Sequence, residues 1–553
     1  MPVEHSPGTV PAAEQKLYAL ADAYYEAKFE RFPIMASELG RHEFDAELGR
    51  PDEKCFKADA KAVEGLMAAV EDLPEHEFTG QGWLDRRCLL AQLRTERMNL
   101  ADLHTWRRNP NRHASAAIDS LLSLVIRNAD NLGKVAPALE SRLKQIPRYL
   151  DDAESVIKDP VPLWVKLTER TCAGVGGFLD SLLEQLSKVS DTPHEKLAKR
   201  IDDAKKAFAG YAKAVAKKKP GPRDGFSLGT QRFETLVRER LGMNVTAREA
   251  EAMGRALVET LTRELEAETA KVGGRGKTAA EVLAEARAEW RPASGDLLTE
   301  YAAKTAEVRG RFADADAVSF PPGEVLLVKP VPDFLMHEIP TAAYSSPGPF
   351  DDEQIGIFWV NDLGRTKTDP AAKAAEQSQH FGMELTCAHE AYPGHHLQFC
   401  TANRHPTKLR RLFSHAVYYE GWTLWVEQMC IDLNIAAGPY ARLQQLHDAL
   451  WRANRILIDC GLHTGRLTYK GAVKQLVESV GFTEARAQAE INWYSQSPTV
   501  PMSYLIGKYE NLRLKRKYVD QGGWSLRRFN DWLLGWGTVP QRWIEQAAGA
   551  SRQ

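Results

Sequence analysis

Residues that could bind a metal ion and transfer protons are concentrated in one part of the sequence. Eight of the 15 histidines lie within residues 380–463. The densest stretch, MELTCAHEAYPGHHLQFC, contains His389, Glu390, His395 and His396. Imidazoles are common ligands of Zn²⁺, and a carboxylate beside a metal-activated water can act as general base. This pattern predicts metal-dependent chemistry, and the alternative is a set of structural histidines in the core.

The spacing of these histidines differs from the helical zinc motif HExxH, in which two histidines one turn apart bind one ion. Position 393, where the second histidine would lie, is proline. In a straight helix His395 would lie about 120° around the axis from His389, and His396 about 10 Å along it. Pro393 lacks a backbone N–H and clashes with a carbonyl one turn earlier, and Gly394 permits unusual dihedral angles. We therefore predict that the helix breaks here, so that a histidine after the break returns toward His389.

A third metal ligand is expected from an apolar segment downstream. Glu420 lies 25 residues after His395, within SHAVYYEGWTLWVEQM. Burying an unpaired carboxylate among such residues is costly, and a metal ion would remove that cost. Glu427, two turns later, is either a rival ligand or a partner of a ligand. Two histidines and one glutamate would leave a fourth position open for water, as in catalytic zinc sites.

A second group of polar residues recurs at helical spacing in WRANRILIDCGLHTGRLTY. It consists of Arg452, Arg455, Asp459 and His463. An arginine here could bind a substrate carboxylate through two hydrogen bonds, and His463, oriented by Asp459, could stabilise a transition state. The alternative is the solvent-facing stripe of an ordinary amphipathic helix.

A third group lies in PMSYLIGKYE, where Tyr504 and Lys508 are one turn apart. Tyr504 could donate a hydrogen bond to the oxyanion that forms when water attacks an amide carbonyl. Lys508 could bind a terminal carboxylate. The alternative for the tyrosine is an ordinary position in the core.

The elements that would position these residues are mostly helices, so the predicted fold class is mainly α. Apolar residues recur at steps of three and four in residues 15–31, 84–107, 114–129, 134–157, 162–188, 194–216, 230–241, 246–271, 277–290 and 295–312. A small β-sheet is expected near residues 318–362, with strands at Glu324–Val328 and Ile355–Val360, and helices return from about residue 375. We therefore predict an N-terminal helical region at residues 1–315 and a catalytic region at residues 316–553.

Composition excludes several classes of protein. The 553 residues include 72 Lys and Arg against 74 Asp and Glu, and this balance argues against binding to nucleic acid. The seven cysteines are odd in number and widely spaced, which argues against a disulfide framework and favours a reducing compartment. The sequence shows neither a secretory signal nor an apolar run of about 18 residues, so we expect a cytoplasmic protein without a membrane span.

The motifs HEAYPGHHLQ, YYEGWTLWVE and PTVPMSYLIGKYE, in this order, resemble those of the bacterial domain-of-unknown-function family 885. The N-terminal FPIMASELGRHEFDAEL is similar to the opening segment of that family. Its members resemble gluzincin-type zinc metallopeptidases. The resemblance implies a large helical, channel- or cleft-containing metallopeptidase-like fold, in which the N-terminal helices line a channel that limits substrate size. It also implies that His389, His395 and Glu420 are the zinc ligands and that Glu390 is the base.

The expected function is zinc-dependent hydrolysis of a peptide or related amide bond, on small peptides. Glu390 would transfer the proton of the attacking water, and Tyr504 or His463 would stabilise the oxyanion. The residues expected to contact the substrate are His396, Arg455 and Lys508. Two alternatives are a metal-dependent amidohydrolase of a small N-acyl or amino-acid-derived metabolite and a non-catalytic binding protein with a degenerate metal site.

Overall fold

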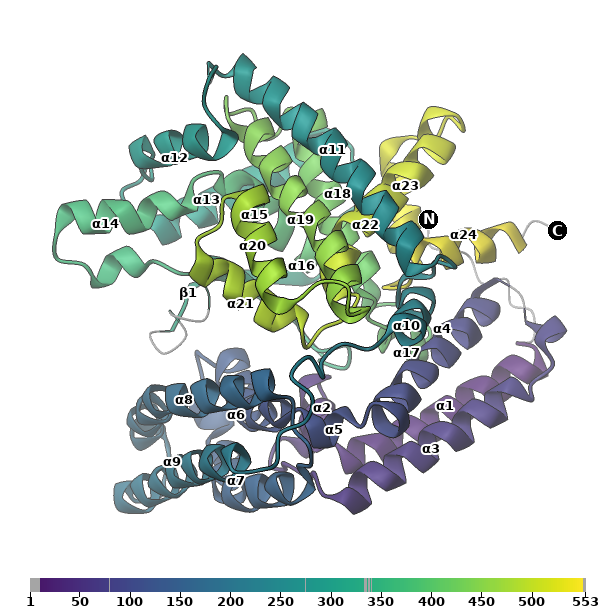
Figure 1. The fold of residues 1–553 in the computed structure, drawn as a ribbon, viewed down its shortest axis with the longest axis vertical. Coiled ribbons are helices and arrows are strands. Elements are labelled where there is room, and N and C mark those ends of the chain that lie inside the picture. The colour runs from purple at the N-terminus through teal and green to yellow at the C-terminus, as the bar shows by residue number, and fades with distance from the viewer. Residues whose placement is uncertain are drawn as a thin grey trace. The chain divides into compact units, whose positions relative to one another are not determined.

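Helices form most of the chain, as the periodicity predicts (Figure 1). The computed structural model describes residues 10–550 apart from residues 79, 274, 333–335, 337, 338 and 340. The chain forms two compact units, Val10–Phe226 and Ser227–Gln553. The sequence predicts a boundary near residue 315, but that position lies inside the second unit. The change of residue pattern there marks the step from helix to strand within this unit.

The unit Val10–Phe226 consists of helices joined by short turns. Its elements are α1 (Ala12–Arg31), α2 (Pro33–Glu38), η1 (His42–Phe44), α3 (Glu53–Glu71), η2 (Glu75–Glu77), α4 (Gly80–Arg97), η3 (Met98–Asp102), α5 (Thr105–Arg108), α6 (Pro110–Arg127), η4 (Leu132–Lys134), α7 (Ala136–Val156), α8 (Pro162–Val189) and α9 (His194–Ala216). Helix α3 is not among the predicted helices, although Asp52 caps it by accepting a hydrogen bond from the Cys55 backbone N–H.

The unit Ser227–Gln553 contains further helices and a small sheet. Its helices are α10 (Thr230–Leu241), α11 (Ala247–Lys271), α12 (Ala279–Glu289), α13 (Leu297–Asp314), η6 (Leu363–Thr366), α14 (Pro370–Gln377), η7 (Ser378–His380), α15 (Met383–Glu390), α16 (His395–Ala402), α17 (Lys408–Arg411), α18 (Ala416–Asp432), α19 (Ala441–His463), α20 (Tyr469–Val480), α21 (Glu484–Tyr494), α22 (Val500–Lys515), η8 (Arg516–Asp520), α23 (Leu526–Leu534) and α24 (Gln541–Ala550). In the part of the chain that is described, no helix is both long and apolar enough to cross a membrane.

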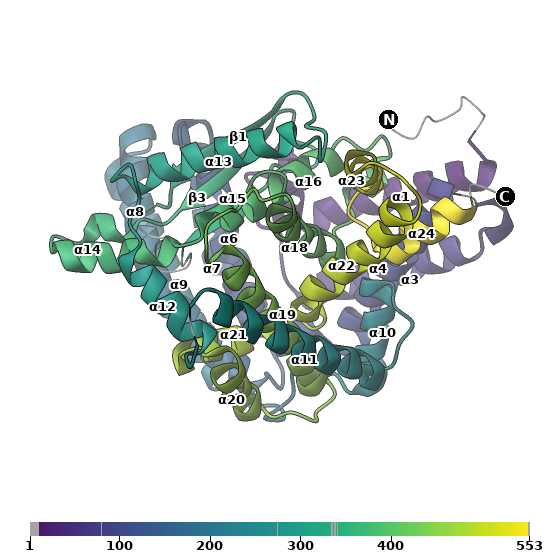
Figure 2. The same cartoon turned by 90° about the horizontal axis from the view of Figure 1, so that it is seen from above.

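The sheet has three strands, β1 (Glu324–Pro330), β2 (Ala342–Ser345) and β3 (Gln354–Val360), in the order β1–β3–β2. Strand β3 is parallel to β1 and antiparallel to β2. The two predicted strands are confirmed as β1 and β3. Helix α13 runs along β1 and β3 (Figure 2), where Tyr301 packs edge-on against Phe358 with ring centroids 5.6 Å apart. Helices α15 and α16 contact β2 and β1, so the sheet supports the two helices that carry the central histidines.

Helices α18 and α22 cross at two glycines. Helix α18 is buried on nearly all sides, as expected for a helix that is apolar around its whole circumference. A Cβ atom at Gly421 would lie 2.5 Å from the backbone of Gly507, and a Cβ atom at Gly507 would clash with the Val417 carbonyl oxygen. The two backbones therefore touch, and this contact sets Glu420 of α18 beside Tyr504 of α22.

Replacing Gly507 by alanine should destabilise the protein by about 1–3 kcal/mol, because the new methyl group must push the two helices apart. The control is Gly310→Ala in α13, where an added Cβ meets nothing within 4 Å and helix propensity improves. Thermal unfolding midpoints of both variants measure the difference. Equal midpoints for Gly507→Ala and the wild-type protein would show that the crossing is not this tight.

Candidate metal centre

Three side chains from three helices converge in the unit Ser227–Gln553. One ligand atom each from His389, His395 and Glu420 lies within 4.8 Å of the other two. Oε2 of Glu420 is 3.9 Å from Nε2 of His389 and 3.7 Å from Nε2 of His395. The side chains are only 12%, 11% and 10% exposed, in the order His389, His395, Glu420. Zinc ligands lie about 2.0–2.2 Å from the ion, so atoms on one ion are separated on the order of 3–4 Å, as these are.

The predicted break in the helix brings the two imidazoles together. Helix α15 ends at Glu390 and α16 begins at His395, and the rings of His389 and His395 are 5.0 Å apart at 82°. A Cβ atom at Gly394 would clash with the carbonyl oxygen of His389, so this close turn requires glycine. The indole N–H of Trp422 donates to the Pro393 carbonyl at 2.7 Å. Helix α18 thus supplies Glu420 and, two residues later, the group that fixes the turn.

Glu420 has one carboxylate oxygen without a protein partner. Tyr504 lies beside Glu420, but Oε2, the oxygen nearest the two imidazoles, is buried and has no hydrogen-bond partner among the described residues. Burial raises the pKa of Glu420, and the nearby His389 and Tyr504 oppose the increase. A buried, unpartnered carboxylate oxygen facing two imidazole nitrogens fits a divalent cation such as zinc, because the ion would satisfy all three ligand atoms.

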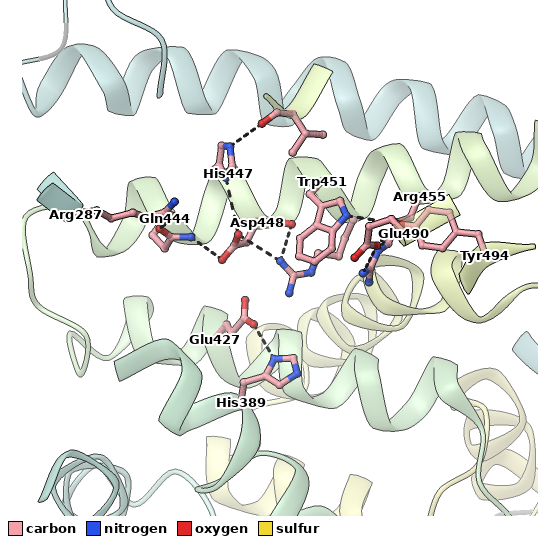
Figure 3. Close-up of polar contacts among 12 residues, drawn as sticks. Arg287, His389, Glu427, Gln444, His447, Asp448, Trp451, Arg455, Glu490 and Tyr494 are labelled. Carbon is pink, nitrogen blue, oxygen red and sulfur yellow. Dashed lines mark hydrogen bonds and ion pairs between the residues drawn. The ribbon is translucent and has the colours of Figure 1, made fainter. Parts of the chain in front are cut away.

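Glu427 orients one of the imidazoles. Its Oε1 lies 2.8 Å from Nδ1 of His389 (Figure 3), which leaves Nε2 of that ring for the ion. Carboxylates commonly hold the outer nitrogen of metal-binding histidines and raise their basicity. Of the two roles that the sequence leaves open for Glu427, the structure favours the partner of a ligand.

Replacing Glu427 by alanine should therefore weaken zinc affinity about 10–100-fold, since the His389 ring loses the group that sets its orientation and tautomer. Competition with a chromophoric chelator measures the affinity. Glu259→Ala, at an exposed position of α11, is the matched control and should bind zinc as the wild-type protein does. If both variants have wild-type affinity, the His389–Glu427 contact has no part in metal binding.

Glu390 is the last residue of α15 and directly follows His389. Burial raises the pKa of Glu390 to about 7; His389 lowers it, and the Glu420 and Glu427 carboxylates raise it further. Glu390 is the chain neighbour of His389, and the Glu420 and Glu427 carboxylates contribute to its raised pKa. A base with a pKa near neutrality suits proton transfer at physiological pH.

The structure does not bring His396 into the cluster. Its Nε2 lies 2.7 Å from Oε2 of Glu324 on β1, and its Nδ1 lies 3.0 Å from the Tyr344 hydroxyl on β2. Tyr392 donates a hydrogen bond to the same Glu324 oxygen. Both ring nitrogens of His396 are thus engaged by protein groups, so His395 is the histidine that joins His389, and His396 anchors α16 to the sheet instead of facing a substrate. Sequence reasoning missed Glu324 and Tyr344, because no sequence signal pairs them with His396.

In the polar stripe of α19, Asp459 and His463 contact other backbone segments instead of the cluster. Asp459 is fully buried, and its carboxylate accepts hydrogen bonds from the backbone N–H groups of Thr499 and Met502, at the start of α22. His463 lies 3.5 Å from Asp459, and its Nε2 is 3.0 Å from the Tyr494 carbonyl oxygen. His463 is two turns beyond Arg455, about 12 Å along the helix axis. Asp459 therefore fixes the start of α22, whereas His463 is held by the end of α21, and the structure does not bring His463 to the cluster.

Of the remaining predicted residues, Tyr504 and Arg455 lie near Glu420. Arg455 contacts the ring of Tyr504, with its guanidinium carbon 4.6 Å from the ring centroid. Lys508, one turn after Tyr504, is buried, and burial lowers its pKa to about 8 while Glu427 opposes the decrease. Tyr504 contacts the ligand Glu420 directly, which the sequence alone does not predict.

Comparisons with known proteins identify a family but no activity. The model of a family described as "Bacterial protein of unknown function (DUF885)" matches residues 33–547. A structure from Shewanella oneidensis is described as a candidate lipoprotein of unknown function. It is 19% identical to this chain with a TM-score of 0.76, and the match covers 96% of this chain and 99% of that protein's chain. A candidate lipoprotein from Colwellia psychrerythraea is 19% identical with a TM-score of 0.77. The match covers 98% of this chain and 100% of that protein's chain. A search of the curated proteins finds no significant match.

Proposed function

Because the chain belongs to the DUF885 family of bacterial proteins of unknown function, we propose its function from the metal centre: zinc-dependent hydrolysis of a peptide or related amide bond, with small peptides as substrates. The observation that supports this proposal most strongly is the unpartnered, buried oxygen of Glu420 facing His389 and His395. Two histidines and a distal glutamate are also the ligand set of the gluzincin-type metallopeptidases that the motifs resemble.

In this proposal His389, His395 and Glu420 hold the ion, and Glu427 and Tyr504 orient two of these ligands. Zinc held in this way supplies a Lewis acid that makes water nucleophilic near neutral pH and polarises a carbonyl. Glu390 accepts the proton of the attacking water and passes it to the leaving amine, so the amide C–N bond is replaced by a carboxylate and a free amine. The buried surroundings of Glu390 raise its pKa and suit it to both proton transfers.

The proposal is tested with the purified full-length protein. Elemental analysis should find about one zinc per chain, and chelation followed by zinc addition should abolish and restore hydrolysis of dipeptides and tripeptides. N-acyl amino acids, assayed beside the peptides, distinguish a peptidase from an amidohydrolase of small metabolites. Zinc bound without hydrolysis of any substrate would instead indicate a binding protein, and protein that neither retains nor takes up zinc would contradict the proposal.

A further inference from the structure

Two arginines of α19, Arg452 and Arg455, are termed the arginine pair, and Arg455 lies in a polar network with residues of α21 (Figure 3). Nε of Arg455 donates to the Tyr494 hydroxyl at 2.9 Å, and Nη2 donates to Oε2 of Glu490 at 3.0 Å. Nη1 of Arg452 donates to the Asp448 carbonyl oxygen at 3.1 Å and lies 3.5 Å from its carboxylate. Each arginine of the pair thus has a carboxylate partner that holds it in place.

Some N–H groups of the arginine pair have no hydrogen-bond acceptor among the described residues. A guanidinium has five N–H groups, and Nη1 of Arg455 and Nε of Arg452 are buried without a hydrogen-bond partner among the described residues. Arg455 as a whole is only 4% exposed, so water is not freely available to it. The network also contains Arg287, whose Nε is unpartnered too. Unmade hydrogen bonds of buried charged groups are costly, and an anionic acceptor would remove that cost.

The arginine pair lies close to the metal ligands. The guanidinium carbon of Arg455 is 4.6 Å from the centroid of Tyr504, and the Tyr504 side chain lies beside Glu420. The path from Arg455 across this ring to the Glu420 carboxylate is therefore on the order of 10 Å.

We propose that the arginine pair binds a carboxylate of the substrate, and that the substrates are short peptides whose free C-terminal carboxylate lies one or two residues past the cleaved bond. An extended chain spans about 3.3–3.6 Å per residue, so one or two residues and an Arg–carboxylate contact cover a distance of this size. This inference rests on the proposed function and narrows it to cleavage near the C-terminus. An acidic side chain at the same position offers the same chemistry, and the experiment separates the two sources.

The first test needs only the wild-type protein. N-blocked tripeptides that differ in a free C-terminal carboxylate or a C-terminal amide are compared, together with an amidated peptide that has glutamate near its C-terminus. We expect kcat/KM for the free acid to exceed that for the amide at least tenfold. Equal cleavage of acid and amide overturns the inference but leaves zinc-dependent hydrolysis intact. If the glutamate peptide is cleaved better than the free acid, the arginine pair binds an acidic side chain, and this result also overturns the inference. Absence of zinc-dependent hydrolysis of every peptide is instead a failure of the proposed function.

The second test uses variants of the arginine pair. Arg455→Lys keeps the charge that Glu490 requires but loses the planar fork, and Arg452→Gln removes the other charge. Both should raise KM for the free acid about tenfold or more, reduce the preference for acid over amide, and leave the zinc content unchanged. Arg466→Gln, at a half-exposed ion pair with Glu251, is the matched control and should retain the wild-type preference. An unchanged preference in both arginine variants would contradict the assignment.

Discussion

Glu390→Gln should lower kcat for peptide hydrolysis about 10²–10⁴-fold while one zinc per chain remains bound. Glutamine has nearly the same shape as glutamate but cannot accept the proton of the attacking water. The three ligand atoms belong to other side chains, so the substitution leaves the donor set of the ion complete. Steady-state kinetics and elemental analysis of the same preparation measure the two quantities.

Glu384→Gln is the matched control, because Glu384 lies on the same helix and its carboxylate is paired with Lys304, 3.5 Å away. It should change kcat only a few-fold. Full activity of Glu390→Gln would show that another group accepts the proton, while zinc-dependent hydrolysis itself would still stand.

His389→Ala and Glu420→Ala should each reduce zinc affinity by more than the 10–100-fold loss that is typical for an outer partner such as Glu427, because each removes a bond to the ion itself. Hydrolysis should be lost in parallel at limiting zinc. Chelator competition gives the affinity, and activity is measured as a function of free zinc.

His396→Asn supplies the comparison, because His396 is next to His395 but faces the sheet. This variant should retain zinc affinity and lose stability, since Glu324 then loses its imidazole partner. If both His389→Ala and Glu420→Ala retain one tightly bound zinc per chain, the ion binds at another site.

Local sequence signals predict much of the fold and the centre of the site. Helices α8 and α9 follow from apolar residues at steps of three and four, and β1 and β3 follow from short apolar runs between prolines and glycines. The break between Glu390 and His395 follows from the properties of Pro393 and Gly394 alone. These effects act within a few residues, so they can be derived before the tertiary structure is known.

The contacts that sequence reasoning misses join distant parts of the chain. His396 looks like a ligand candidate until Glu324 and Tyr344 engage both of its ring nitrogens. His463 has a spacing that suggests the same helix face as Arg455, but it lies about two turns further along α19 and contacts the Tyr494 carbonyl at the end of α21. Such pairings depend on how helices cross, and helix spacing alone does not determine the crossing.

The three proposed ligand residues, and the carboxylate that contacts one of them, all fall between His389 and Glu427. In this proposal, a short, contiguous piece of the gene encodes all three ligand residues and Glu427. Outside this segment, Tyr504 and Gly507 of α22 and Glu324 of β1 hold its helices in place, so the loops between elements can change in length while these positions cannot. Over evolutionary time we expect this segment to change slowly and the lengths of the surrounding loops to diverge freely, so that distant homologues are best sought with this segment alone.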